Sequence, residues 1–337
     1  MIALAYQVYI VGLSIDKACQ LLNFFEQLKI RKSQADAILS QLARAWESEF
    51  EVLCTLLANS AVVHCDETSW SINSVWAFLN EHLTVMFYGV HKDGDTLAAI
   101  LDKSQFKGTL VSDNAAVYQC FTSSQKCWAH LIRKAIKLTL EDPSSEVYRS
   151  LADELLLIYR DAKKLSLDRR YSEAGRQLKV AELDDRVLEA CCRGGWTRQS
   201  VGIEGPVGDY HRLCNELMGL MIDCELFVFV MDLNVAGTNN ASERLLRSSA
   251  MARRTGRTSK TTWGGKRQSI ISSVIESVGK QLKDFNLASV IDEVKRWTTV
   301  GQSCFEEQLK LLKAAQPKKG ILDRLILNPD NCKPLKA

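Results

Sequence analysis

Residues 61–90 decide the fold class, and they read AVVHCDETSWSINSVWAFLNEHLTVMFYGV. Three short runs within this stretch, at 61–65, 75–79 and 83–88, are rich in β-branched and aromatic residues. Such runs with tight connections are typical of neighbouring β-strands, and Asn80-Glu81-His82 has the composition of a hairpin turn. The stretch therefore predicts three antiparallel strands.

On the C-terminal side the pattern predicts a short helix over 95–101 and a buried fourth strand over 108–112, which ends at Asp113. The expected order is β-β-β-α-β. Helical periodicity then resumes at Ala115 and, after a break at Pro143, continues to about Leu188. The chain is thus expected to be an α/β protein whose mixed sheet is flanked by helices and interrupted by a helical insertion.

On the N-terminal side apolar residues recur at steps of three and four from Ser14 to Phe50, which is the helical period. Two helices are predicted, with a basic turn between them and Ser33 as the cap of the second. Two interpretations are open: a helical hairpin packed on the main domain, or a helix-turn-helix-like unit that reads DNA. The hairpin is favoured because such hairpins are common and the motif has no sharp signature.

The composition is that of an ordinary globular protein, with 337 residues, 46% hydrophobic and 25% charged. This length suggests two domains, or one core with a large insertion. Lys and Arg number 43 against 40 Asp and Glu, a formal charge of +3, so any nucleic-acid signal must be local. The eleven cysteines include no C-x-x-C pair, which argues against structural zinc. Their odd number, the adjacent Cys191 and Cys192, and the length of the chain argue against a disulfide framework. No stretch resembles a signal peptide or a membrane span, so we expect a cytoplasmic protein without a membrane partner.

Three carboxylates stand out by context: Asp66 at the end of the first predicted strand, Asp113 at the end of the fourth, and Glu243 in the first turn of a helix beginning near Ala241. Ends of neighbouring strands converge at one edge of a sheet, where α/β proteins place ligands. Mg²⁺ prefers oxygen ligands, so three carboxylates suffice for one or two ions. A pair of ions would hold the attacking and leaving oxygens of a displacement at phosphorus.

Each carboxylate also has a structural interpretation. Asp113 suits the cap of the helix that follows, and Asn240 with Glu243 approximates a capping box, which spacing alone favours for Glu243. Glu67 is a second carboxylate beside Asp66, although strand alternation sends the two to opposite faces.

A strongly basic stretch follows Glu243, and no acidic residue interrupts it before Glu276. Ordinary helix faces mix charges of both signs, so this excess predicts contacts with DNA phosphates, which carry no sequence information. The predicted DNA-binding residues are Arg244, Arg247, Arg253, Arg254, Arg257, Lys260, Lys266 and Arg267.

Auxiliary residues are predicted on one further helix and at the start of the late one. His130 and Arg133 lie three residues apart, on one face of a helix. A lone histidine is more often buried and structural, but beside Arg133 it suits contact with a phosphate or with a metal-bound carboxylate. Asn240, next to the late carboxylate, is the third auxiliary candidate.

Taken in order, the motifs resemble those of transposases of the insertion-sequence 66 family, over about Leu13 to Trp297. Any one motif is weak, but the ordered set is specific. The motifs are VHCDETSW at 63–70, GTLVSD at 108–113 with Tyr118, CWAHLIR at 127–133, Leu226-Phe227-x-Phe229, and TNNASERLLR at 238–247.

The resemblance implies an Asp-Asp-Glu transposase with an RNase H-like core, in which Asp66, Asp113 and Glu243 bind metal. It implies two Mg²⁺ or Mn²⁺ ions, and as partners the transposon ends and target DNA, a second copy of the chain on DNA, and accessory proteins of the element. The implied segments are a helix-turn-helix-like part at 1–55, core at 56–140 and 237–300, a helical insertion at 141–236, and a C-terminal tail at 301–337.

The expected function is metal-dependent DNA cleavage and strand transfer. Family members usually carry a coiled-coil or basic region and a cysteine-rich zinc-binding segment ahead of the helix-turn-helix-like part, and this chain begins just inside the latter. The alternatives are a truncated or catalytically idle DNA-binding remnant, and an RNase H-like nuclease that cuts without joining.

Overall fold

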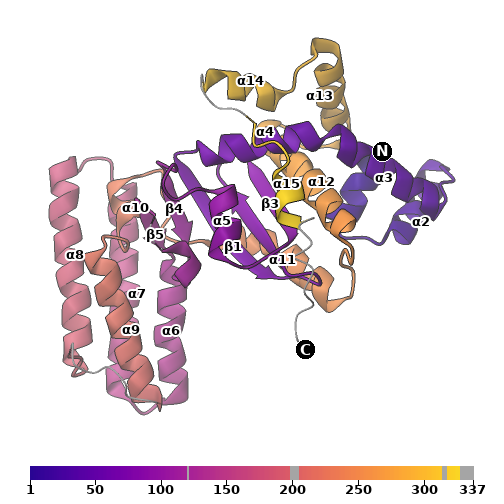
Figure 1. Cartoon of the computed structure of the whole chain (residues 1–337). Coiled ribbons are helices and arrows are strands. Elements are labelled where there is room, and N and C mark those ends of the chain that lie inside the picture. Colours follow the sequence, from indigo (N-terminus) through magenta and orange to yellow (C-terminus); the bar gives the residue numbers. More distant parts are fainter. Residues whose placement is uncertain (120, 198–204, 313–316, 327–337) are drawn as a thin grey trace. The chain divides into compact units, whose positions relative to one another are not determined.

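The computed structural model describes residues 1–119, 121–197, 205–312 and 317–326. The chain is mixed α/β and mostly helical, and the described residues include five strands (Figure 1). It divides into two compact units. The first unit comprises residues 1–108 and 241–337, and the second comprises residues 109–240.

Three antiparallel strands form the sheet of the first unit: β1 (Val62–Ser69), β2 (Ser74–Leu79) and β3 (Thr84–Val90). This confirms the strands and the hairpin predicted from the sequence. The Asn80 side-chain oxygen accepts hydrogen bonds from the backbone N–H groups of His82 and Leu83, at 2.8 and 2.7 Å, and so closes the turn. Because the ladder continues to the pair Ser69 and Ser74, Asp66 lies inside β1 and not at its end as predicted.

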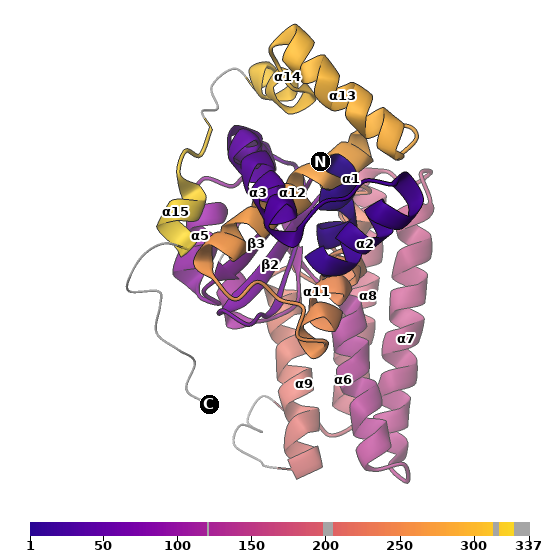
Figure 2. The same cartoon turned by 90° about the vertical axis from the view of Figure 1, so that its right-hand side faces the viewer.

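Helix α12 (Thr262–Gln281) covers the outer edge of β3 (Figure 2). The hydroxyl oxygens of Ser269, Ser273 and Ser277 accept the backbone N–H groups of Tyr88, Met86 and Thr84, at 2.8, 2.8 and 3.0 Å. Serines four residues apart share a helix face, and alternate strand residues point their N–H groups the same way. A step of four residues along α12 therefore matches a step of two residues along β3. The serine hydroxyls satisfy backbone N–H groups that this edge strand would otherwise leave unpaired.

The first turn of α12 approaches β3 closely. A Cβ atom at Gly265 would lie 2.8 Å from the carbonyl oxygen of Tyr88, so only glycine permits this distance without a shift. The approach allows the serine hydroxyls to reach the strand.

The other helices of the first unit come from both ends of the chain. They are α1 (Ile2–Ala5), the π-helix η1 (Tyr6–Ile10), α2 (Ile15–Glu26), α3 (Lys32–Ala45), α4 (Glu47–Ala58), α5 (Gly94–Ile100), α11 (Asn240–Arg254), α13 (Leu287–Val300), α14 (Cys304–Leu311) and α15 (Ile321–Ile326). No helix among the described residues is both long enough and apolar enough to cross a membrane.

Two predictions about these helices are wrong. Ser33 does not cap the second N-terminal helix, because α3 already begins at Lys32 and Gln34 Oε1 accepts the backbone N–H of Arg31 at 2.9 Å. The stretch after Gln316 is polar and basic in sequence, which predicts poor order, but α15 buries four apolar side chains, Ile321, Leu322, Leu325 and Ile326. Their spacing places them on one face of the helix. Residues 327–337 lie outside the described residues.

The second unit pairs two short parallel strands, β4 (Thr109–Ser112) and β5 (Ser124–Lys126), with a helical bundle. The sequence did not predict β5, because three polar residues show no strand pattern. The helical run predicted after Pro143, from Val147 to about Leu188, is divided into two helices. The first ends at Leu167, and Ser172 caps the second. The helices are the 3₁₀-helix η2 (Ala116–Tyr118), α6 (Trp128–Glu141), α7 (Glu146–Leu167), α8 (Glu173–Arg193), α9 (Gly205–Ile222) and α10 (Val228–Met231), of which α6 to α9 form the bundle (Figure 1).

Candidate functional site

Strand pairing determines the side of the sheet on which Asp66 lies. Asp66 pairs with Ala77 of β2, and directly paired residues point their side chains to the same face. Ala77 belongs to a buried cluster that also contains Met86, Tyr88 and Leu246 of α11. Because Asp66 shares a face with Ala77, it lies on the face of the sheet against which α11 packs. Its side chain is half-buried there.

Glu67 points to the opposite face, as strand alternation predicts. Its side chain is 2% exposed and forms an ion pair with Lys92, with 2.5 Å between Oε1 and Nζ. The backbone N–H of Glu67 donates to Asp66 Oδ1 at 2.9 Å. The two adjacent carboxylates are thus in different environments, and Glu67 has a structural counter-ion.

Glu243 lies in the first turn of α11, three residues before Leu246. Residues at this spacing share a helix face, so Glu243 is on the side of α11 that faces the sheet. Helix α11 begins at Asn240, so its N-cap position is Asn239. The N3 position, where a capping box needs its Glu or Gln, is then Ser242 and not Glu243. The capping box that the sequence suggested for Asn240 and Glu243 is therefore one residue out of register. Within the first unit, Asp66 and Glu243 lie on the same side of the sheet.

Asp113 directly follows β4 in the second unit. Its Oδ1 accepts the backbone N–H of Ala115 at 3.0 Å, so the residue closes the turn after the strand. The same residue lines a cavity of about 230 Å³. The lining residues are Asp113, Asn114, Ala115, Lys126, Cys127, His130, Leu131, Lys134 and Glu216.

A polar network supports the wall of this cavity. Glu216 of α9 accepts hydrogen bonds from Asn114 Nδ2 at 2.9 Å and from Lys134 Nζ at 2.6 Å. It thereby ties the loop that carries Asp113 to α6 and α9. Lys126 is 1% exposed, and its Nζ donates to the carbonyl of Tyr118 at 3.2 Å.

Sequence reasoning missed Glu216 and Lys126, although both line the cavity beside Asp113. Glu216 lies within a mostly apolar stretch and has no recognisable motif. Its partners come from residues far away in the chain, so no local signal could have identified it. Of the predicted auxiliary residues, His130 lines this cavity, whereas Arg133 is on the exposed side of α6 and does not. Asn240 is exposed at the start of α11.

Six of the eight predicted DNA-binding residues are exposed in the structure. They lie along α11 and in the loop that leads to α12: Arg244, Arg247, Arg253, Arg254, Arg257 and Lys260. We call these residues the exposed basic group.

Lys266 and Arg267 lie in α12 and have different surroundings. Lys266 is 5% exposed and forms ion pairs with Glu47 of α4 and Asp323 of α15, at 2.6 and 2.5 Å. Its Nζ is therefore not available for the phosphate contact that the sequence predicts. Arg267 is 11% exposed, and its Nη1 bonds to Asp36 Oδ1 of α3 at 2.7 Å. Both residues hold helices of the first unit together.

Comparison with known proteins identifies the family. No curated protein and no solved structure matches the chain. A family model described as "Transposase IS66 family" matches residues 1–267, which include the five described strands and all three carboxylates discussed above. This match covers well over half of the chain and agrees with the resemblance carried by the ordered motifs. The chain therefore belongs to the IS66 family of transposases.

Proposed function

We propose that this protein catalyses metal-dependent DNA cleavage and strand transfer of an insertion sequence, with Asp66, Asp113 and Glu243 as its metal ligands in an RNase H-like core. The observation that carries the proposal is the register of β1 on β2. That register places Asp66 on the face of the sheet where α11 packs, and Glu243 lies on the matching face of α11. Two carboxylates far apart in sequence are thereby on the same side of the sheet.

The donor atoms fit the metal that the family implies. Three carboxylates offer only hard oxygen ligands, which Mg²⁺ and Mn²⁺ prefer. Asp66 is half-buried and Asp113 lines a polar cavity, so neither is sequestered in an apolar core. One or two ions, when bound, would polarise the scissile phosphoryl group and lower the pKa of water.

The chain's own residues supply the remaining functions. The reaction comprises two phosphoryl transfers, in which water first attacks at the end of the element and the freed 3′ hydroxyl then attacks target DNA. The exposed basic group would hold phosphates by charge-assisted hydrogen bonds. His130, in the cavity beside Asp113, is suited to donate a hydrogen bond to that carboxylate or to a phosphate, with Arg133 and Asn240 as further auxiliaries.

The proposal retains the expected organisation. Residues 1–55 form the helix-turn-helix-like part, residues 56–140 and 237–300 form the core, residues 141–236 form a helical insertion in it, and residues 301–337 are the C-terminal segment. It also retains a second copy of the chain on DNA and accessory proteins of the element as partners.

The decisive experiment replaces Asp113 with Asn. The amide keeps the shape of the side chain but removes the charge that attracts a divalent cation. We expect cleavage and strand transfer of labelled oligonucleotides with Mn²⁺ to fall to background, while DNA affinity stays close to that of the wild type because it depends on basic residues. The matched control is Asp223→Asn, since Asp223 is exposed at the end of α9 and outside the cavity.

Cleavage and strand transfer by Asp113→Asn at the wild-type rate would contradict the assignment of Asp113, whereas equal loss of binding and cleavage would indicate that the variant is misfolded. Two results with the wild-type protein would contradict the proposed activity. A wild-type protein that binds DNA but neither cuts nor joins would be the idle remnant. A protein that cuts without joining would be a nuclease.

A further inference from the structure

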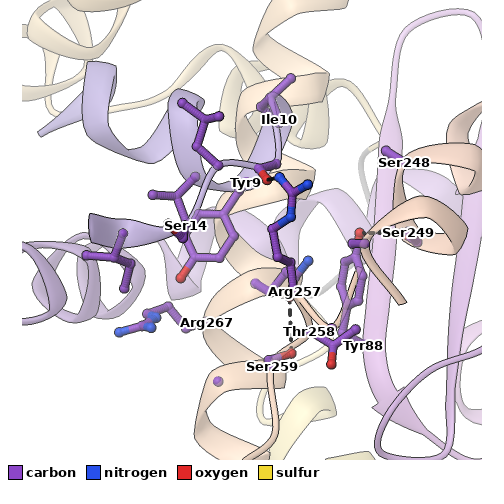
Figure 3. Close-up of a pocket in the computed structure, with 18 residues that line it drawn as sticks. Tyr9, Ile10, Ser14, Tyr88, Ser248, Ser249, Arg257, Thr258, Ser259 and Arg267 are labelled. Carbon is purple, nitrogen blue, oxygen red and sulfur yellow. Dashed lines mark hydrogen bonds between the residues drawn. The ribbon is translucent and has the colours of Figure 1, made fainter. Parts of the chain in front are cut away.

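A second cavity lies entirely within the first unit and has a volume of about 320 Å³ (Figure 3). Its walls come from four segments: the N-terminal residues 8–15, Tyr88 of β3, the middle of α11, and the loop and first turns that lead into α12. Figure 3 shows Tyr9 and Ser14 on one side, Ser248, Ser249 and Tyr88 on the other, and Arg257 between them. We call this cavity the Arg257 pocket.

The lining of the Arg257 pocket has the chemistry of an anion site. Two arginines line it, and no carboxylate is among its lining residues. Hydroxyl groups and one amide supply further donors. Arg, Ser, Thr, Tyr and Gln side chains are those that contact phosphate oxygens in nucleic-acid complexes. The polar lining residues are Tyr9, Ser14, Tyr88, Ser248, Ser249, Arg257, Thr258, Ser259, Arg267 and Gln268.

Two hydrogen bonds from its guanidinium group hold the Arg257 side chain in place. Nη1 donates to the carbonyl of Gly12 at 3.0 Å, and Nε donates to Thr255 Oγ1 at 3.1 Å. A guanidinium carries more N–H groups than these two bonds use. The side chain is therefore oriented before a ligand arrives and still has donors to offer, which reduces the entropy lost on binding.

Arg267 adds an unsatisfied donor. Its Nη1 bonds to Asp36 Oδ1 and to Ser40 Oγ, at 2.7 and 3.0 Å, but its Nε is buried and has no hydrogen-bond partner within the described part of the chain. Water cannot reach this Nε, so what Arg267 offers a ligand in the pocket is its positive charge and its remaining N–H groups. Burial raises the pKa of neighbouring Tyr9 to about 12, so its hydroxyl, which is protonated at neutral pH in any tyrosine, stays a hydrogen-bond donor well into the alkaline range.

We propose that the Arg257 pocket binds one phosphate group of the DNA backbone, between the guanidinium groups of Arg257 and Arg267. This inference rests on the proposed DNA-processing function and adds a specific anchor to it. Most of the exposed basic group lies outside this pocket, whereas the pocket would hold one phosphate between four segments of the chain and so fix the DNA at one point. The pocket is formed in part by residues 8–15, so this N-terminal segment takes part in DNA binding.

The test uses two variants of the full chain that block the pocket in different ways. Arg257→Gln removes a charge, and Ser248→Phe fills the space without removing any charge. Ser248 is exposed, and within the described residues its hydroxyl bonds only to the carbonyl of Leu245 in its own helix, at 3.2 Å. The substitution therefore breaks no tertiary hydrogen bond that the structure describes. Met251→Phe is the steric control. Arg149→Gln in α7 is the charge control, because Arg149 is not among the residues predicted to bind DNA. Both residues are exposed and outside the pocket.

Two measurements distinguish free phosphate from DNA as the source of the group. Inorganic phosphate should raise the melting temperature of the wild type and of both controls, but not of Arg257→Gln or Ser248→Phe. Labelled duplex DNA should bind Ser248→Phe about tenfold more weakly than wild type, the effect expected for losing one charge-assisted hydrogen-bonded group. Met251→Phe should bind DNA as tightly as wild type.

Two results would overturn the inference. Phosphate protection that survives in both pocket variants would show that the pocket holds no phosphate. Loss of phosphate protection with unchanged DNA affinity in Ser248→Phe would show that the ligand is a free phosphate compound and not DNA. Circular dichroism tests whether each variant folds. If Ser248→Phe is misfolded, the phosphate measurement is decided by Arg257→Gln alone. Because both readouts measure binding, they are independent of the cleavage assay on Asp113→Asn.

Discussion

The exposed basic group and Lys266 belong to one continuous basic stretch, yet they occupy opposite environments. Arg253 and Arg254 are exposed at the end of α11, whereas Lys266 is 5% exposed and has carboxylate partners in α4 and α15. Arg267 is intermediate, because it is bonded to α3 on one side and lines the Arg257 pocket on the other. A run of like charge thus shows that positive charges are in excess, but not which of them are available to DNA.

The difference arises from the packing of α12. This helix covers β3 through its serines, and its first turns also contact α3, α4 and α15. A basic residue in those turns faces other helices and not solvent. The counter-ions Glu47 and Asp323 lie far from Lys266 in the sequence, so the local pattern does not show them.

The largest expected effect is on stability. Lys266→Met keeps most of the side-chain volume but removes the cation, leaving Glu47 and Asp323 without their shared partner. Breaking a buried ion pair from one side costs about 3–5 kcal/mol, so we expect a loss near the lower figure because both carboxylates are partly exposed. Urea denaturation measures the change. A stability within experimental error of the wild type would show that the two ion pairs of Lys266 make no net contribution to folding.

The next largest effect is on DNA binding and concerns the exposed basic group. Arg253, Arg254 and Arg257 replaced together by Ala should flatten the plot of log affinity against log salt by about 0.9 for each charge, or about 2.7 in all on duplex DNA. Binding should weaken for all sequences alike, because phosphate contacts do not read bases. An unchanged slope would show that these arginines never meet DNA, and a sequence-selective loss would indicate base contacts.

A smaller effect on stability is expected when the ion pair of Arg267 is broken. Asp36→Asn removes the charge that faces Arg267 without altering the pocket wall itself. Asp36 is 54% exposed, so we expect a loss of only about 1 kcal/mol, near the upper end for an exposed pair. Thermal unfolding at low and high salt measures it, since a partly exposed pair is screened. A loss as large as that of Lys266→Met would mean that the whole start of α12 is structural.

The smallest effect is expected at Lys260, which lies in the loop between the two environments. Lys260→Ala should change stability by less than about 0.5 kcal/mol, because the residue is exposed. It should reduce the magnitude of the salt slope by about 0.9 if its ammonium group neutralises one phosphate. Fluorescence anisotropy over a range of salt concentrations measures the slope. If the slope keeps its wild-type value, the DNA-contacting surface ends before Lys260.

The sequence by itself determined the first three strands, the hairpin at Asn80, the family, and the three carboxylates as candidates. These features depend on local propensity, on alternation, or on motifs that read in order along the chain. Only the tertiary structure decided that Asp66 faces α11 while Glu67 pairs with Lys92, that Glu216 supports the Asp113 loop, and that Lys266 is buried between Glu47 and Asp323. The physical reason is that exposure and ion pairing depend on which segments, separated in sequence, pack together. A charge in a local pattern carries no information about a partner tens to hundreds of residues away.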